Sequence, residues 1–350
     1  MPAPVLIHLL PTTVTPDRLA GSIAVMIDVL LESLFENAVK GWLLDHKVLS
    51  AKFSIMATGG YGRAELCPYS DIDISLLYGS STGQKIHDFQ KWITRHLLYP
   101  LWDLKFKVGH ASRTIKESIA EAKADMQTKT ALLQSRHICG EAKLTVEFHK
   151  KFRKFLQKDS PWEYLQARRN DQKKRRAKHL DTVFVQEPDI KNGVGGLRDF
   201  QNLIWMAEVK FGISSLGGLL EAGYIQKGEH KELTEAYDFL LRVRNELHFQ
   251  SSHPTNTLLL DKQPLVAFSL GYRQRNMLKR VERFMRDYYA HARKIYTLTN
   301  ALEKHFLLPE ETDHGLRNRL VPGGTKEVDG FFLNKGELEL LSENVFEEDP

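Results

Sequence analysis

A glycine turn followed by two aspartates at alternating positions is the feature that most restricts how this chain folds. Residues 59–73 read Gly-Gly-Tyr-Gly-Arg-Ala-Glu-Leu-Cys-Pro-Tyr-Ser-Asp-Ile-Asp. Side chains two positions apart on a strand point to the same face, so Asp71 and Asp73 would present two carboxylates together. Magnesium prefers such oxygens and usually keeps substrate phosphates among its ligands. The pattern predicts a metal-dependent nucleotidyl transferase in which the turn at Gly59 and Gly60 faces a triphosphate.

A second glycine-containing segment narrows this prediction to one family. Residues 187–191 read Glu-Pro-Asp-Ile-Lys, and residues 195–199 read Gly-Gly-Leu-Arg-Asp. In this order and at this distance, the two segments resemble the bacterial PII uridylyltransferases, a branch of the DNA polymerase β-type nucleotidyltransferase superfamily. The resemblance spans roughly residues 50–300, and it also takes in Leu-Trp-Asp at 101–103, Val-Gly-His at 108–110, Arg113, Arg-Asn at 244–245 and His248.

The resemblance implies an α+β fold, with a small polymerase β-like mixed-sheet nucleotidyltransferase domain followed by an all-α helical bundle domain. The predicted parts are an N-terminal helical segment (1–48), the catalytic domain (49–115), the helical bundle (116–310) and an acidic C-terminal segment (311–350). In the family, a stretch like residues 345–350 leads into an HD hydrolase domain and two ACT domains, neither of which this sequence contains. We therefore expect the chain to add UMP without removing it, and to respond poorly to glutamine.

The hydrophobic periodicity predicts individual elements in the first third of the chain. A helix is expected from Asp17 towards Lys47, and another over residues 84–99, ended by Pro100. From about residue 113 the pattern is helical almost throughout. The alternating segments predict three strands, at residues 52–58, 71–78 and 103–109.

A third carboxylate is expected near the aspartate pair, because two-metal phosphoryl transfer usually uses a further acidic ligand. Asp103 is the candidate, since it opens the predicted third strand and the register of that strand would bring it beside Asp71 and Asp73. It also belongs to the Leu-Trp-Asp match with the family. The alternative is a simple cap between the helix and the strand.

Three further residues lie near the glycine turn. Arg63 would contact phosphate or form a salt bridge with Glu65. Ser70 would fix the entry to the strand through its hydroxyl and a backbone partner, and would also line the nucleotide pocket. Ala64 stands where the family more often has glycine, so a slightly stiffer turn is expected there.

The second segment is predicted to contact the triphosphate on the side opposite the catalytic domain. Lys191 and Arg198 supply positive charge, while Gly195 and Gly196 give a flexible backbone before a helix, which is a natural anion site. Asp199 would cap or face that helix. The alternative is an interdomain loop without a ligand.

Two further segments carry charge. The run of basic residues between Arg168 and Lys178 would bind nucleic acid or an acidic partner, or would form a solvated helix face, which we favour because no aromatic residues are interleaved for base stacking. Residues 244–248, Arg-Asn-Glu-Leu-His, are predicted to form a buried helix face near the nucleotide.

Length, charge and cysteine content bear on the number of domains, nucleic-acid binding and the cellular compartment. The 350 residues suffice for two ordinary domains, and a net charge of +5 argues against a dedicated nucleic-acid binder. Two cysteines, Cys67 and Cys139, cannot build a disulfide framework, which favours the cytoplasm. No apolar run approaches the length of a membrane span.

The resemblance implies transfer of UMP from UTP to a tyrosine of the PII signalling protein, with release of pyrophosphate. Asp71, Asp73 and Asp103 would hold Mg²⁺, with Mn²⁺ as a possible substitute. The alternatives are another acceptor (a protein, a small molecule or an RNA end) or a catalytically inactive nucleotide-binding regulator. The aspartate pair speaks against the regulator, while base selectivity and oligomeric state stay open.

Overall fold

The computed structural model describes residues 16–46, 52–79, 84–251 and 253–308, together with three short strands between 327 and 340. The chain divides into two compact units, Met1–Asn300 and Ala301–Pro350. The first 15 residues of the expected N-terminal segment and most of the expected acidic segment lie outside the described residues. None of the helices in the described part of the chain has the length and apolar character needed to cross a bilayer.

The centre of the first unit is a four-stranded mixed sheet in the order β3-β2-β1-β4. Strand β1 (Phe53–Ala57) is antiparallel to both β2 (Ile72–Tyr78) and β4 (Arg136–Gly140). Strand β3 (Val108–Thr114) is parallel to β2. The first two strands match the predicted ones to within one residue at each end, and the α+β class with a small mixed sheet is confirmed.

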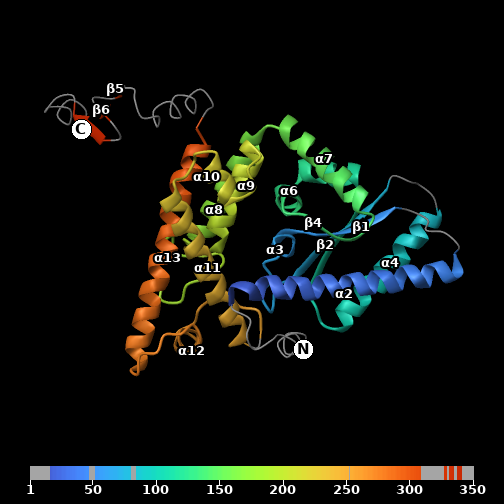
Figure 1. Cartoon of the computed structure of the whole chain (residues 1–350), viewed down its shortest axis with the longest axis horizontal. Coiled ribbons are helices and arrows are strands. Elements are labelled where there is room, and N and C mark those ends of the chain that lie inside the picture. The colour runs from blue at the N-terminus through green and yellow to red at the C-terminus, as the bar shows by residue number, and fades with distance from the viewer. Residues whose placement is uncertain are drawn as a thin grey trace. The chain divides into compact units, whose positions relative to one another are not determined.

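One face of the sheet packs against α2 (Pro16–Asp45) and α4 (Gln84–Asp103), as Figure 1 shows. Alternate residues of β2, Ile72, Ile74 and Leu76, supply the sheet side of this core. The helices contribute apolar residues at helical spacing, including Ile23, Ile27 and Leu31 from α2 and Phe89, Ile93 and Leu97 from α4.

The opposite face packs against α5 (Ile115–Ala124), α6 (Met126–Leu133) and α7 (Ala142–Lys158). Met56 and Leu77 are the sheet residues in this second core. Because both faces are covered, the polar residues at the start of β2 emerge only at the edge of the layered structure, where a ligand has access.

The third strand differs from its prediction. Helix α4 continues through Pro100 to Asp103, and β3 begins only at Val108. An internal proline removes one helical hydrogen bond, but Leu97, Leu98 and Leu101 are all fully buried on this turn. Each such side chain contributes roughly 1.5–3 kcal/mol, which outweighs the lost bond.

Strand β4 was not predicted, because only Ile138 among its five residues is buried and no alternating pattern is visible. It pairs with β1 from beyond residue 115, so the predicted limits of the catalytic domain do not contain the whole sheet. Helices α5 to α7 also pack on the sheet, and α6 contacts α9 as well.

The rest of the first unit is helical, as predicted for this part of the sequence. A loop over residues 178–196 separates α8 from α9. The elements are α8 (Pro161–Ala177), α9 (Leu197–Phe211), α10 (Leu216–Glu221), α11 (Lys227–Phe249), α12 (Gln263–Ser269) and α13 (Met277–Phe306), the last of which continues past residue 300. The second unit contains a three-stranded antiparallel sheet of β5 (Glu327–Val328), β6 (Phe331–Asn334) and β7 (Glu337–Leu340).

Candidate active site

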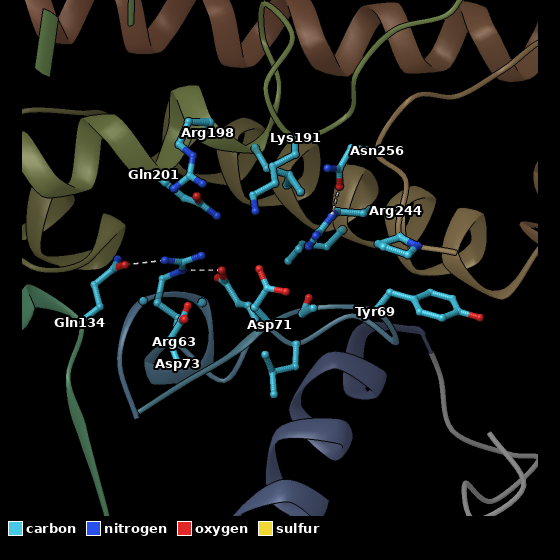
Figure 2. A pocket seen from close by; sticks show the side chains of 18 of the residues that line it. Arg63, Tyr69, Asp71, Asp73, Gln134, Lys191, Arg198, Gln201, Arg244 and Asn256 are labelled. Atoms are coloured by element: carbon cyan, nitrogen blue, oxygen red, sulfur yellow. Dashed lines mark hydrogen bonds and ion pairs between the residues drawn. The ribbon is translucent and has the colours of Figure 1, made fainter. Parts of the chain in front are cut away.

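A cavity of about 380 Å³ lies at the start of β2, within the usual size range of small-molecule sites. Figure 2 shows that its walls come from the glycine turn and β2 on one side and from the 178–196 loop, α9 and α11 on the other. Most of the predicted site residues line it, namely Gly59, Gly60, Arg63, Ser70, Asp71, Asp73, Lys191 and Arg198.

The two aspartates line the cavity together. Asp71 immediately precedes β2 and is exposed, whereas Asp73 lies on the strand and is half-buried. Burial, followed by the neighbouring charge of Asp71, raises the pKa of Asp73, and Lys191 partly opposes this shift. A cation between the two carboxylates would relieve their repulsion.

Strand β3 leaves room for this pair. Gly109 is the register partner of Asp73, and a Cβ atom at Gly109 would lie 2.3 Å from Asp73 Oδ1. Among the described residues no group of three or more His, Cys, Asp or Glu side chains is arranged to hold a metal. Magnesium commonly takes only one or two protein carboxylates and completes its shell with phosphate oxygens and water, so Asp71 and Asp73 fit that ion.

The glycine turn forms the short helix α3 (Gly59–Gly62) directly beside Asp73. Gly59 has φ 56°, a conformation that glycine adopts without steric cost, and a Cβ there would lie 3.6 Å from Asp73 Oδ2. The backbone N–H of Thr58 donates to the Asp73 carbonyl oxygen at 2.9 Å. The turn is therefore held against the strand that carries the carboxylates.

Arg63 forms the expected salt bridge with Glu65 and also lines the cavity. Its Nε donates to Glu65 Oε2 at 2.5 Å, its Nη1 donates to Gln134 Oε1, and its side chain lines the cavity. Glu65 Oε2 also accepts a hydrogen bond from the Tyr237 hydroxyl at 2.8 Å. Burial acts to lower the pKa of Arg63, but Glu65 and Tyr237 outweigh it, so the pKa is raised. The guanidinium is permanently charged and fixed in direction.

Two neighbours of the turn also meet their expectations. Ser70 Oγ accepts from the backbone N–H of Cys67 at 2.9 Å, and Ser70 lines the cavity. Ala64 has φ 58°, in the left-handed region that costs a residue with a Cβ roughly 1 kcal/mol. This strain explains why glycine suits that position.

Lys191 and Arg198 form the wall opposite the aspartates, and Figure 2 shows the Lys191 ammonium directed toward Asp71. Burial, then Arg244 and Arg198, lowers the pKa of Lys191 to about 8. Burial, then Arg63, lowers the pKa of Arg198 to about 10. Half-buried cations that disfavour one another's charge are complementary to a polyanion such as a triphosphate.

The two glycines of the second segment lie outside the cavity lining, contrary to their predicted contact with nucleotide. Gly195 has φ 71°, and a Cβ there would lie 2.1 Å from the Ala292 carbonyl oxygen of α13. A Cβ at Gly196 would lie 2.8 Å from the Ile190 carbonyl oxygen. Both glycines permit close backbone packing, which fixes the loop that carries Lys191.

Asp199 anchors the same loop from inside. It is fully buried, and its carboxylate accepts from the Gly195 N–H at 2.9 Å, from Arg175 at 2.5 Å and from Arg176 at 2.9 Å. Asp199 itself belongs to α9, and its carboxylate bonds the backbone before that helix and two arginines of α8, charged partners that the sequence did not suggest.

The preferred interpretation of the basic run as a solvated face is wrong for three of its residues. Arg168 and Arg176 are buried, and Arg175 is mostly covered, because each has a polar or aromatic partner on α9 or the loop before it. Lys173 and Lys174 are exposed, as predicted. One face of α8 is therefore structural and the other is solvated.

Asp103 is not beside the aspartate pair. It is exposed at the end of α4 and does not line the cavity. The predicted register fails because the strand starts five residues later, so that Gly109 and not a carboxylate faces Asp73. The structure removes Asp103 from the predicted set of metal ligands.

The prediction of a buried helix face over residues 244–248 is confirmed. Arg244 and His248 are buried on α11 and both line the cavity. Burial, then the charge of Arg244, lowers the pKa of His248 to about 3, so its imidazole is neutral near pH 7. His248 Nδ1 accepts from the Tyr69 backbone N–H at 3.3 Å, which connects α11 to the loop before β2.

Comparison with known proteins gives matches to one family. Residues 163–303 match the family model described as GlnD PII-uridylyltransferase. The chain is 35% identical over 309 residues (85% of this chain, 32% of the relative) to the bifunctional uridylyltransferase/uridylyl-removing enzyme of Caulobacter vibrioides. The chain belongs to the PII-uridylyltransferase family. The resemblance carried by the two glycine-containing segments is thereby confirmed.

Other relatives with the same name cover similar lengths. The enzyme of Phenylobacterium zucineum is 36% identical over 310 residues (85% of this chain, 32% of the relative). That of Hydrogenovibrio crunogenus is 34% identical over 331 residues (93% of this chain, 35% of the relative). The chain thus spans about a third of the length of the curated relatives that it matches.

Several polar residues of the cavity were missed from the sequence, among them Lys107, Gln134, Gln201 and Asn256. Lys107 directly precedes β3, and pairing that strand in parallel with β2 would have placed it beside Asp71. Gln134, Gln201 and Asn256 are isolated polar residues on α9 or in loops, and no local pattern distinguishes them from surface residues.

Proposed function

We propose that this chain transfers UMP from UTP to a tyrosine hydroxyl of a PII signalling protein, in a magnesium-dependent reaction. The observation that carries the proposal is one cavity in which Asp71 and Asp73 face Lys191 and Arg198. Family membership supports the nucleotide and the acceptor, because the matched family is described as a PII-uridylyltransferase. A cytoplasmic location belongs to the same proposal, since Cys67 and Cys139 are both free thiols.

In this proposal Asp71 and Asp73 hold magnesium, which would neutralise charge on the α-phosphate and on the leaving pyrophosphate. Lys191 and Arg198 bind the outer phosphate oxygens from the opposite wall. Arg63, fixed by Glu65 and Gln134, orients the triphosphate at the glycine turn. Positioning and charge neutralisation therefore supply most of the acceleration.

The bond changes are those of a nucleotidyl transfer. The tyrosine oxygen of the acceptor forms a bond to the α-phosphorus, and the bond from that phosphorus to the oxygen bridging to the β-phosphate breaks. The electrons of the broken bond leave with pyrophosphate, and the hydroxyl proton passes to solvent water. Asp103 takes no part, because it lies outside the cavity.

The test is transfer of label from each α-labelled nucleoside triphosphate to purified PII protein, with magnesium present. UTP should label a tyrosine, and Asp71→Asn or Asp73→Asn should lower the rate by about a hundredfold or more, because each removes several kcal/mol of charge stabilisation. Asp103→Asn is the matched control and should retain normal transfer. Unimpaired transfer by the first two variants, or strong loss in the control, would contradict the site assignment.

A further inference from the structure

One amide of the cavity is held in a single orientation. Arg244 Nε donates to Asn256 Oδ1 at 2.9 Å, as the dashed line in Figure 2 shows. A guanidinium has no acceptor, so the amide atom that faces it must be the oxygen. The Asn256 Nδ2 group is therefore on the other side of the amide, where Figure 2 shows it turned toward Lys191 and the cavity.

The surroundings of this amide are rigid. Arg244 is buried, and its Nη1 donates to Cys67 Sγ at 3.1 Å. The Asn256 carbonyl oxygen accepts from the Ile190 backbone N–H at 2.8 Å, which fastens its loop to the segment carrying Lys191. Asn256 thus presents a hydrogen-bond donor whose direction is set before any ligand arrives.

The position of Asn256 along the cavity decides which part of a nucleotide meets it. In Figure 2 Arg63 lies at one end, Asn256 and Arg244 lie at the other, and Asp71 lies between them. The proposed function, on which this inference rests, places the triphosphate between the aspartates and the glycine turn. The nucleoside then extends toward Asn256.

We propose that Asn256 selects the base, with its Nδ2–H group donating to O4 of uracil. Cytosine carries an amino group in place of O4, so CTP would bring two donors face to face. Leaving both without an acceptor costs enough for about ten- to hundredfold discrimination against CTP. Asn256 is a specificity-determining residue of this site.

The test is Asn256→Asp in the full chain. One carboxylate oxygen keeps the hydrogen bond from Arg244, and the other replaces the donor with an acceptor. We expect the ratio of kcat/KM for UTP to that for CTP to fall by at least about tenfold, with an absolute gain in CTP use.

Gln134→Glu is the matched control, because Gln134 Oε1 is also held by an arginine, Arg63, but at the glycine-turn end. It introduces the same charge and should lower the use of both nucleotides alike, leaving their ratio unchanged. Asn256→Ser, which removes the donor without adding an acceptor, should weaken UTP use without raising CTP use, and serves if the aspartate variant unfolds.

The outcomes separate this inference from the function on which it rests. An equal loss for UTP and CTP in Asn256→Asp, or an equal change of ratio in Gln134→Glu, would overturn the role of Asn256 while wild-type UMP transfer still supported the proposed function. Wild-type protein that transfers no nucleotide to PII would refute the proposed function itself.

Discussion

Asp199→Asn is the substitution that best tests how the second glycine-containing segment is held in place. The change keeps the size of the side chain but removes its charge, and it leaves Arg175 and Arg176 facing a neutral amide in a fully buried position. Removing one partner of a buried charge pair typically costs about 3–5 kcal/mol. With a urea dependence of about 3 kcal/mol per molar, the unfolding midpoint should fall by about 1 M or more.

The assay is urea unfolding followed by circular dichroism, with calorimetric titration of UTP into the folded protein. Because Asp199 also accepts from the Gly195 N–H, the loop that carries Lys191 should loosen and UTP affinity should fall along with stability.

Asp171→Asn is the matched control. Asp171 makes a longer ion pair with Arg168, at 3.6 Å, and 40% of its side chain is exposed, so its loss should cost less than about 1 kcal/mol. If the two variants unfold at the same urea concentration, the claim that Asp199 anchors the loop through buried charge is refuted.

Two further predictions concern other charged groups of the described residues. Arg198→Ala should weaken UTP binding about ten- to hundredfold because a charge-assisted contact is lost, whereas exposed Lys173→Ala should not, and calorimetric titration of both variants checks this. Burial raises the pKa of Glu208 from 4.5 to about 7, so the folded state resists ionisation of this carboxyl group. The free energy of unfolding should therefore fall by up to about 3 kcal/mol as the pH rises from 4.5 to 7. Glu208→Gln should abolish that fall in urea unfolding across this pH range, and an unchanged pH profile would contradict the assignment.

The sequence was sufficient for the parts of the site that local chemistry dictates. The turn at Gly59 and the alternation of Asp71 and Asp73 depend on backbone conformation and strand geometry within a few residues. The same holds for the buried face around Arg244, where helical spacing marks the buried residues. Each of these features is where it was predicted.

Long-range packing decided the rest. Asp103 was misplaced because burial of the Leu97–Leu101 turn carries α4 through Pro100, and strand pairing then brings Gly109 to Asp73. Arg176 is buried because Asp199, on another helix, offers a buried carboxylate. The orientation of the Asn256 amide is set by its hydrogen bond with Arg244, which lies on another element of the fold. A hydrogen bond or ion pair between residues distant in the chain leaves no periodic trace in either segment, so only the folded arrangement reveals it.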